Sequence, residues 1–111
     1  MDLVTGGFSQ GKKAFCKKQF GEAEIWEDFE KYVKESLTQG KDFKKIQDEV
    51  IERLKKSPDI KIISTETGCG IVPVEEFDRK WREVTGRLLC FLAEKAKGVY
   101  RVTCGIGVKI K

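Results

Sequence analysis

A glycine-rich segment near the N-terminus has the residue types and spacing of a phosphate-binding loop. It reads Gly6-Gly7-Phe8-Ser9-Gln10-Gly11-Lys12-Lys13, and its first seven residues fit the pattern G-x-x-x-x-G-K. Glycines let the backbone curl until successive N–H groups converge on a phosphate. The segment lies between a short apolar run and a helical one, and a helix N-terminus attracts anions. We predict that these residues bind phosphate, with Lys12 on the terminal phosphates; the alternative is an ordinary glycine-rich turn with solvated lysines.

Lys13 is the departure from this pattern. A serine or threonine is usual at its position, and the hydroxyl binds the magnesium ion that bridges nucleotide phosphates. An ammonium group cannot coordinate a metal, because it has no lone pair. Either Lys13 neutralises phosphate charge and a nucleotide binds without magnesium, or the site no longer carries out chemistry. We assign no metal ligand.

Glu66 is the best candidate for a catalytic or metal-orienting carboxylate. It follows a short β-rich run at residues 60–64, and open α/β sheets bind their ligands beyond the carboxyl ends of their strands. The alternative is a loop glutamate that caps the next turn. The sequence contains no histidine, so proton transfer would fall to carboxylates, lysines or water.

Apolar periodicity predicts the elements that must position these residues. We expect strands at 2–5, 60–64, 99–104 and 108–111, and helices at 12–20, 25–37, 43–54 and 77–92. Strands that alternate with helices indicate crossover connections, hence an α/β fold whose mainly parallel sheet carries helices. The last strand would be an antiparallel hairpin edge, where Lys109 and Lys111 discourage further pairing. Trp26 and Trp81 lie on apolar faces and are predicted to be core residues.

Length and charge point to one domain, residues 1–111, with a modest core. The 22 basic and 18 acidic residues are interspersed, whereas nucleic-acid binders concentrate basic residues on one face. We therefore predict no nucleic-acid partner. No apolar run approaches the roughly 20 residues of a membrane span, and the N-terminus does not resemble a secretory signal. We expect a cytoplasmic protein with no membrane partner, and a small sheet that would gain stability as a homo-oligomer.

The four cysteines lie far apart and form no C-x-x-C pair. Zinc sites need clustered Cys and His ligands at short spacings. We expect reduced cysteines that are mostly packed in the interior.

A second motif carries a family resemblance. Residues Thr65-Glu66-Thr67-Gly68-Cys69-Gly70-Ile71-Val72-Pro73 resemble the N-E-V-G-x-G-I-V-P segment of the adenosylcobinamide kinase/adenosylcobinamide-phosphate guanylyltransferase family. The opening Val4-Thr5-Gly6-Gly7 with Gly11-Lys12 is similar to that family's phosphate loop. Further likenesses are Arg82, Gly86-Arg87, Leu92-Ala93, Val99-Tyr100 and the terminal Gly-x-x-x-Lys-x-Lys.

The resemblance implies a small three-layer P-loop-type sheet and a role in cobalamin biosynthesis. Enzymes of that family phosphorylate adenosylcobinamide with ATP or GTP, and then transfer GMP through a guanylylated histidine. This chain has no histidine, so the resemblance does not extend to guanylyl transfer. Thr65 and Leu89 replace asparagines of the family pattern, and the middle of the chain is shorter, with no apolar strand ending in aspartate.

Two functions remain open at this point, with a weaker third. The first is a kinase-type phosphotransferase using ATP or GTP, with Lys12 on the phosphates and Glu66 near a metal or the acceptor hydroxyl. The second is a non-catalytic module that binds a nucleotide or a corrinoid phosphate, or that regulates or completes another chain. The third is a vestigial loop whose basic helix meets any anion.

Overall fold

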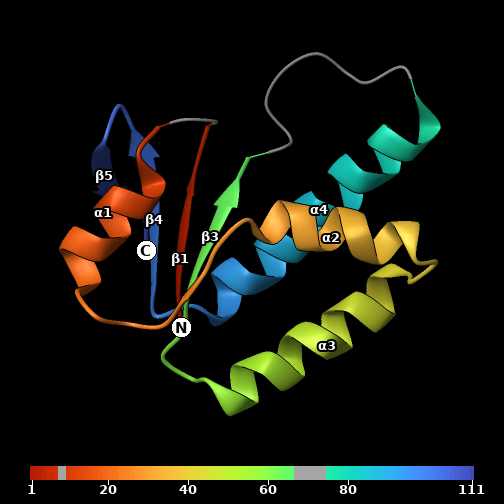
Figure 1. Ribbon diagram of the computed structural model, residues 1–111, viewed down its shortest axis with the longest axis horizontal. Helices are drawn as coiled ribbons and strands as arrows, with labels where there is room; N and C mark the ends of the chain where they lie inside the picture. The colour runs from red at the N-terminus through yellow and green to blue at the C-terminus, as the bar shows by residue number, and fades with distance from the viewer. Residues whose placement is uncertain (8–9, 67–74) are drawn as a thin grey trace.

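The computed structural model describes residues 1–7, 10–66 and 75–111 as an α/β fold (Figure 1). The elements in chain order are β1 (Asp2–Gly6), α1 (Lys12–Phe20), β2 (Ile25–Trp26), α2 (Phe29–Thr38), α3 (Phe43–Lys56), β3 (Lys61–Thr65), α4 (Glu76–Lys95), β4 (Gly98–Thr103) and β5 (Ile106–Lys109). The predicted α1 has the observed bounds, and it ends at Gly21 as expected, with a φ of 65°.

The strands form one mixed sheet in the order β2-β3-β1-β4-β5. The first four strands are parallel, and β5 runs antiparallel to β4. This confirms the predicted mainly parallel sheet with a C-terminal hairpin. Thr5 of β1 lies in register with Ser64 of β3 and Arg101 of β4. The carboxyl ends of these three strands therefore meet at one edge, where the glycine-rich loop leaves β1.

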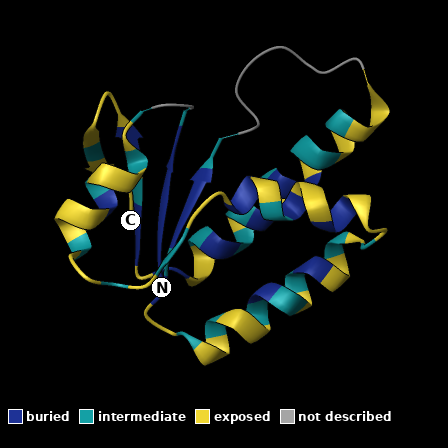
Figure 2. Cartoon of the chain, in the orientation of Figure 1, coloured by how far each residue is buried: buried dark blue, intermediate teal, exposed yellow. Residues whose placement is uncertain are grey.

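Helices cover both faces of the sheet, which gives the three layers that were predicted. In Figure 1, α1 lies on one side of the strands, and α2, α3 and α4 lie on the other. Alternate strand residues supply the two cores: Leu3, Ile62 and Val99 pack toward α2, α3 and α4, whereas Val4, Ile63 and Val102 pack with Cys16 of α1. The larger core is continuous along the inner stripes of the three helices (Figure 2). Strands β1, β3 and β4 are thus anchored on both faces by their period-2 pattern.

The chain between α1 and α2 differs from the prediction. Residues 25–37 were expected to form one helix, but Ile25–Trp26 is a strand that pairs with β3, and α2 begins only at Phe29. Asp28 has a φ of 54°, a left-handed conformation that cannot occur inside an α-helix. The Trp26 ring still packs edge-on against Phe29 at 5.3 Å, so apolar residues three apart meet without a continuous helix.

Burial corrects two further expectations. Phe77, placed on the apolar stripe of α4, is 37% exposed, whereas Leu88 and Leu92 are fully buried. Of the cysteines that the structure describes, Cys16 is buried but Cys90 and Cys104 are exposed, so the expectation of mostly packed cysteines was wrong. Trp26 and Trp81 are partly buried and pack against the core, as predicted.

The bounds of the C-terminal elements also differ from the predicted ones by a few residues. Helix α4 continues to Lys95, Gly98 opens β4 rather than closing the helix, and β5 begins at Ile106 instead of at 108. Lys111 lies beyond β5 and donates to the carbonyl oxygens of Ala93 and Glu94 at 3.0 and 2.8 Å. Such contacts satisfy carbonyl groups that a helix C-terminus leaves unpaired.

Among the described residues, no helix is both long enough and apolar enough to cross a bilayer.

Two glycines, one inside helix α4 and one in a left-handed turn after α2, test the backbone conformation at their positions. Gly86 lies inside α4, and a Cβ added there would meet no atom within 4 Å. We predict that Gly86→Ala raises the free energy of unfolding by about 0.5–1 kcal/mol, since alanine loses less backbone entropy in a helix. Gly40 is also unobstructed but has a φ of 86°, so Gly40→Ala should lower stability by about 1–2 kcal/mol. Urea titration measures the free energy of unfolding of both variants. Equal changes in the two variants would contradict the helical conformation at Gly86 and the left-handed conformation at Gly40.

Candidate phosphate-binding site

The N-terminus of α1 begins directly after the glycine-rich loop. Its N-cap is Gly11, in the left-handed conformation with a φ of 82°, and no side chain of the described residues caps the helix. The first turn contains no acidic residue. The first N–H groups of a helix have no intrahelical acceptor and carry about half a positive charge. Such a helix start has the geometry and the charge to bind an anion.

Lys12 lies across the loop that precedes the helix. Its Nζ donates a hydrogen bond to the carbonyl oxygen of Gly7 at 2.7 Å. Gly6 has to be glycine because a Cβ there would collide with the carbonyl oxygen of Val102 in β4. Gly6, Gly7, Gln10, Gly11 and Lys12 therefore form the turn that was predicted between β1 and α1. Phe8 and Ser9, predicted as phosphate-binding residues, lie outside the described residues.

The turn between β4 and β5 is docked on this loop. The side-chain Oε1 of Gln10 accepts the N–H of Cys104 at 2.7 Å, and the carbonyl oxygen of Gln10 accepts the N–H of Gly105 at 2.8 Å. A Cβ on Gly11 would come within 3.3 Å of the Cα of Gly105. Gln10 was predicted as a phosphate ligand; its side chain holds the hairpin turn. Sequence reasoning missed this contact, because Gln10 and Cys104 are 94 residues apart.

Lys13 is engaged by an acidic residue. Its Nζ lies 2.8 Å from Oε1 of Glu27, and both side chains are partly exposed. The hydrogen bond and the negative charge of Glu27 raise the pKa of Lys13 above its ordinary value. Glu27 directly follows β2, so the strand missed in the sequence positions the partner of Lys13.

A cavity of about 290 Å³ lies between the start of α1 and the acidic segment after β2. Lys12 and Lys13 line one side, and the other side contains Glu27, Glu30 and Thr65 at the carboxyl end of β3. Glu30 is only 6% exposed. Its Oε1 accepts the N–H of Thr65 at 3.0 Å, whereas its Oε2 has no hydrogen-bond partner in the described part of the chain. This buried carboxylate was not singled out from the sequence, since it lies in what was expected to be a mid-helix position.

Glu66 lies next to the loop, at the strand ends where it was expected. Its N–H donates to the carbonyl oxygen of Gly6 at 2.9 Å. Its carboxylate accepts from Arg101 Nη2 at 3.2 Å, and the Thr5 hydroxyl lies 3.5 Å from its Oε1. The structure therefore brings Glu66 and Lys12 to the same edge of the sheet, but it ties Glu66 to Thr5 and Arg101. The role assigned to Glu66 stays a prediction.

The described residues around the loop do not form a metal-binding cluster. Within residues 1–7, 10–66 and 75–111, no group of three or more Cys, Asp and Glu side chains is arranged to hold a metal ion. Lys13 has no lone pair to offer, and Glu27 is paired with it. No catalytic step is assigned to a metal ion.

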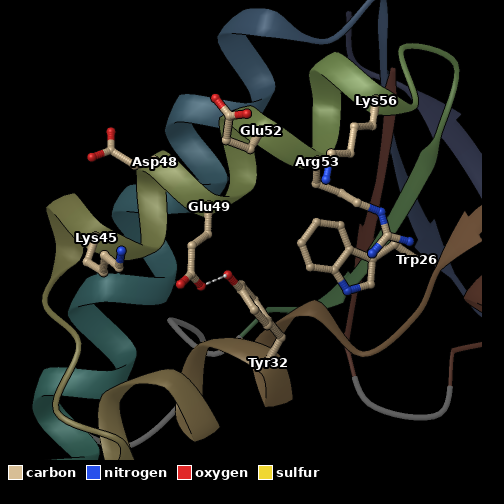
Figure 3. Close-up of a pocket in the computed structure, with 8 residues that line it drawn as sticks. All are labelled: Trp26, Tyr32, Lys45, Asp48, Glu49, Glu52, Arg53 and Lys56. Atoms are coloured by element: carbon tan, nitrogen blue, oxygen red, sulfur yellow. Dashed lines mark hydrogen bonds between the residues drawn. The ribbon is translucent and has the colours of Figure 1, made fainter.

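A different hollow, of about 460 Å³, lies between α2 and α3 (Figure 3). Its walls are Trp26, Tyr32, Lys45, Asp48, Glu49, Glu52, Arg53 and Lys56. The Tyr32 hydroxyl donates to Glu49 at 2.8 Å, and Lys41 forms an ion pair with the same carboxylate at 2.9 Å. Lys41 and Tyr32 together lower the pKa of Glu49. Because opposite charges balance here and several are paired within the protein, we interpret this hollow as helix packing.

The docked turn generates a prediction. Gln10→Ala removes the acceptor of the Cys104 N–H, so we expect faster hydrogen exchange of that amide and a loss of about 0.5–1.5 kcal/mol in unfolding free energy. Gln10→Glu replaces the amide oxygen with a carboxylate oxygen at the same reach, so an acceptor for the Cys104 N–H is kept and the variant serves as the matched control. Unchanged exchange in Gln10→Ala would show that the turn docks without this hydrogen bond.

Comparison with known proteins places the chain in a family. The family model of cobinamide kinase / cobinamide phosphate guanyltransferase matches residues 25–110, which begin after the glycine-rich loop. The bifunctional adenosylcobalamin biosynthesis proteins CobU of Escherichia coli (strain K12) and Salmonella typhimurium (strain LT2) are each 44% identical over 50 residues. This segment is 45% of the chain and 28% of each relative, so the match spans less than a third of the curated relatives. The chain belongs to the cobinamide kinase / cobinamide phosphate guanyltransferase family.

Proposed function

We propose that this family member binds a nucleoside triphosphate, ATP or GTP, by its phosphates at the start of α1. The observation that carries the proposal is the helix N-terminus at Gly11, whose first turn is not acidic and which no side chain of the described residues caps. Lys12 lies over the same loop and needs only to exchange the carbonyl oxygen of Gly7 for a phosphate oxygen. Backbone N–H groups and one lysine are the usual means by which such loops hold phosphates.

The activity proposed for the bound nucleotide is the kinase reaction of the family. The acceptor is the hydroxyl of adenosylcobinamide, whose oxygen attacks the terminal phosphorus. The bond from that phosphorus to the bridging oxygen of the β-phosphate breaks, and the nucleoside diphosphate leaves. Glu66, at the carboxyl edge of the sheet, is the candidate to accept the hydroxyl proton. Lys12 would offset the negative charge on the phosphates. A cytoplasmic location is proposed along with this activity, because the reaction uses ATP or GTP.

The second candidate is a binding module without turnover. It is favoured by Lys13, whose ammonium replaces the metal-binding hydroxyl and is already paired with Glu27. In this case the chain would hold a nucleotide or a corrinoid phosphate, alone or with a partner chain. Guanylyl transfer through histidine is not proposed in either case, since the 111 residues contain none.

Calorimetric titration with ATP and GTP tests the phosphate site. We expect Lys12→Ala to weaken binding by about tenfold or more, because a hydrogen bond between charged groups contributes about 1.5–3 kcal/mol. Lys17→Ala is the matched control: it removes the same charge one turn further along α1 and should change affinity by less than about threefold. If both variants bind as the unchanged protein does, the phosphates do not lie on this loop.

The same titrations, repeated with magnesium and with adenosylcobinamide, separate the two candidates. Formation of a phosphorylated cobinamide would establish the kinase. Nucleotide binding that does not depend on magnesium and that yields no product would establish a binding module without turnover. In that case Lys13→Ser should make nucleotide binding depend on magnesium, since the serine hydroxyl can ligate the ion.

A further inference from the structure

A second hollow begins where the phosphate cavity ends. It has a volume of about 520 Å³ and lies between the outer side of α1 and the β4–β5 turn. Phe15, Lys18 and Gln19 of α1 face Ile106 of β5 across it. Gly11 and Ala14 line both this hollow and the phosphate cavity. The two spaces are therefore neighbours on either side of the helix start, within the size range of small-molecule sites.

Two glycines, Gly105 and Gly107, determine the shape of this hollow and the position of the Phe15 ring that lines it. The Phe15 ring lies so close to Gly107 that a Cβ there would overlap it. The Phe15 ring also packs against the Tyr100 ring, and the two ring centroids are 5.6 Å apart. Gly105, with a φ of 78°, turns the hairpin toward Gly11. The ring of Phe15 is thus held between α1 and β5 by contacts that leave it half-buried, beside the hollow.

The chemistry of the walls differs between the two spaces. Beyond its lysines, the phosphate cavity is lined by the carboxylates of Glu27, Asp28 and Glu30. No acidic side chain lines the hollow at Phe15 in the described part of the chain. Its surface is aromatic at Phe15 and apolar at Ile106, which is 68% exposed, with one amide and one ammonium group beside them. Aromatic and apolar faces stack nucleobases, and an amide can both donate to and accept from a base edge.

We propose that this hollow holds the base and ribose of the purine nucleotide whose phosphates lie on the loop. The inference rests on the proposed function, because covalent continuity requires the base to lie near the phosphates. Phe15 and Ile106 contact the faces of the base, and Gln19 hydrogen-bonds its edge. Lys18 lies nearest the solvent-exposed side of α1 and supplies positive charge.

The test compares GTP and ATP with inorganic tripolyphosphate, which has phosphates but no base. In the unchanged protein, the nucleotides should bind at least about fivefold more tightly than tripolyphosphate. Ile106→Ser should weaken nucleotide binding about fivefold by removing apolar contact, and should leave tripolyphosphate binding unchanged. Ile110→Ser is the matched control, since Ile110 is also exposed, at 63%, and does not line the hollow.

The outcomes separate this inference from the function on which it rests. If tripolyphosphate binds as tightly as the nucleotides, and Ile106→Ser changes nothing, the base does not lie here although the phosphate site stands. If neither tripolyphosphate nor nucleotide binds, both proposals fall. Nuclear Overhauser contacts between the purine H8 and the Phe15 ring protons provide a second measurement that needs no variant, and contacts to Trp26 or Tyr32 instead would overturn the assignment.

Discussion

The positive N-terminus of α1, which no side chain of the described residues caps, fixes where the candidate site lies. A helix start with unsatisfied N–H groups is costly unless water, a side chain or a ligand supplies acceptors. Gly11 allows the chain to turn into the helix in a left-handed conformation and brings no side chain to fill the space. The sheet fixes where this helix start lies, because β1 ends at Gly6 between β3 and β4. The docked β4–β5 turn then holds the loop from the other side.

The replacement at Lys13 is accompanied by a partner of opposite charge. In place of a hydroxyl that would bind metal, the chain has an ammonium group bonded to Glu27. A cation at this point adds charge for phosphates but takes away a metal ligand. Glu66 shows a similar arrangement, since its carboxylate accepts hydrogen bonds from Arg101 and Thr5. The structure therefore has Lys12 beside the glycine-rich loop, as the motif predicts, while Glu27 and Glu66 are each paired within the protein.

The elements that follow local rules could be predicted, and those set by distant contacts could not. Glycines at both ends bounded α1, and the apolar run before the glycine-rich loop identified β1. Strand β2 was missed because Ile25, Phe29 and Val33 recur at helical spacing, although the left-handed Asp28 breaks the helix between them. The local sign of this strand is the β-prone pair Ile25-Trp26, which is followed directly by two acidic residues.

For the candidate site, the motif alone predicted Lys12 and the flanking glycines, and that prediction concerns only neighbours along the chain. The partners of Gln10, Lys13 and Glu66 depend on the strand order β2-β3-β1-β4-β5, which brings together residues far apart in the chain. No spacing rule encodes that order. Glu30 shows the same limit, because its burial beside the loop follows from where α2 packs against β3.

The most direct test of the account is where an anion binds. In a nitrogen–proton correlation spectrum, the amide resonances of Gly11, Lys12 and Lys13 should shift most strongly when inorganic tripolyphosphate is added, and the shifts should saturate together. Strong, saturating shifts confined to other lysine-rich surfaces, with these three amides unmoved, would contradict the account.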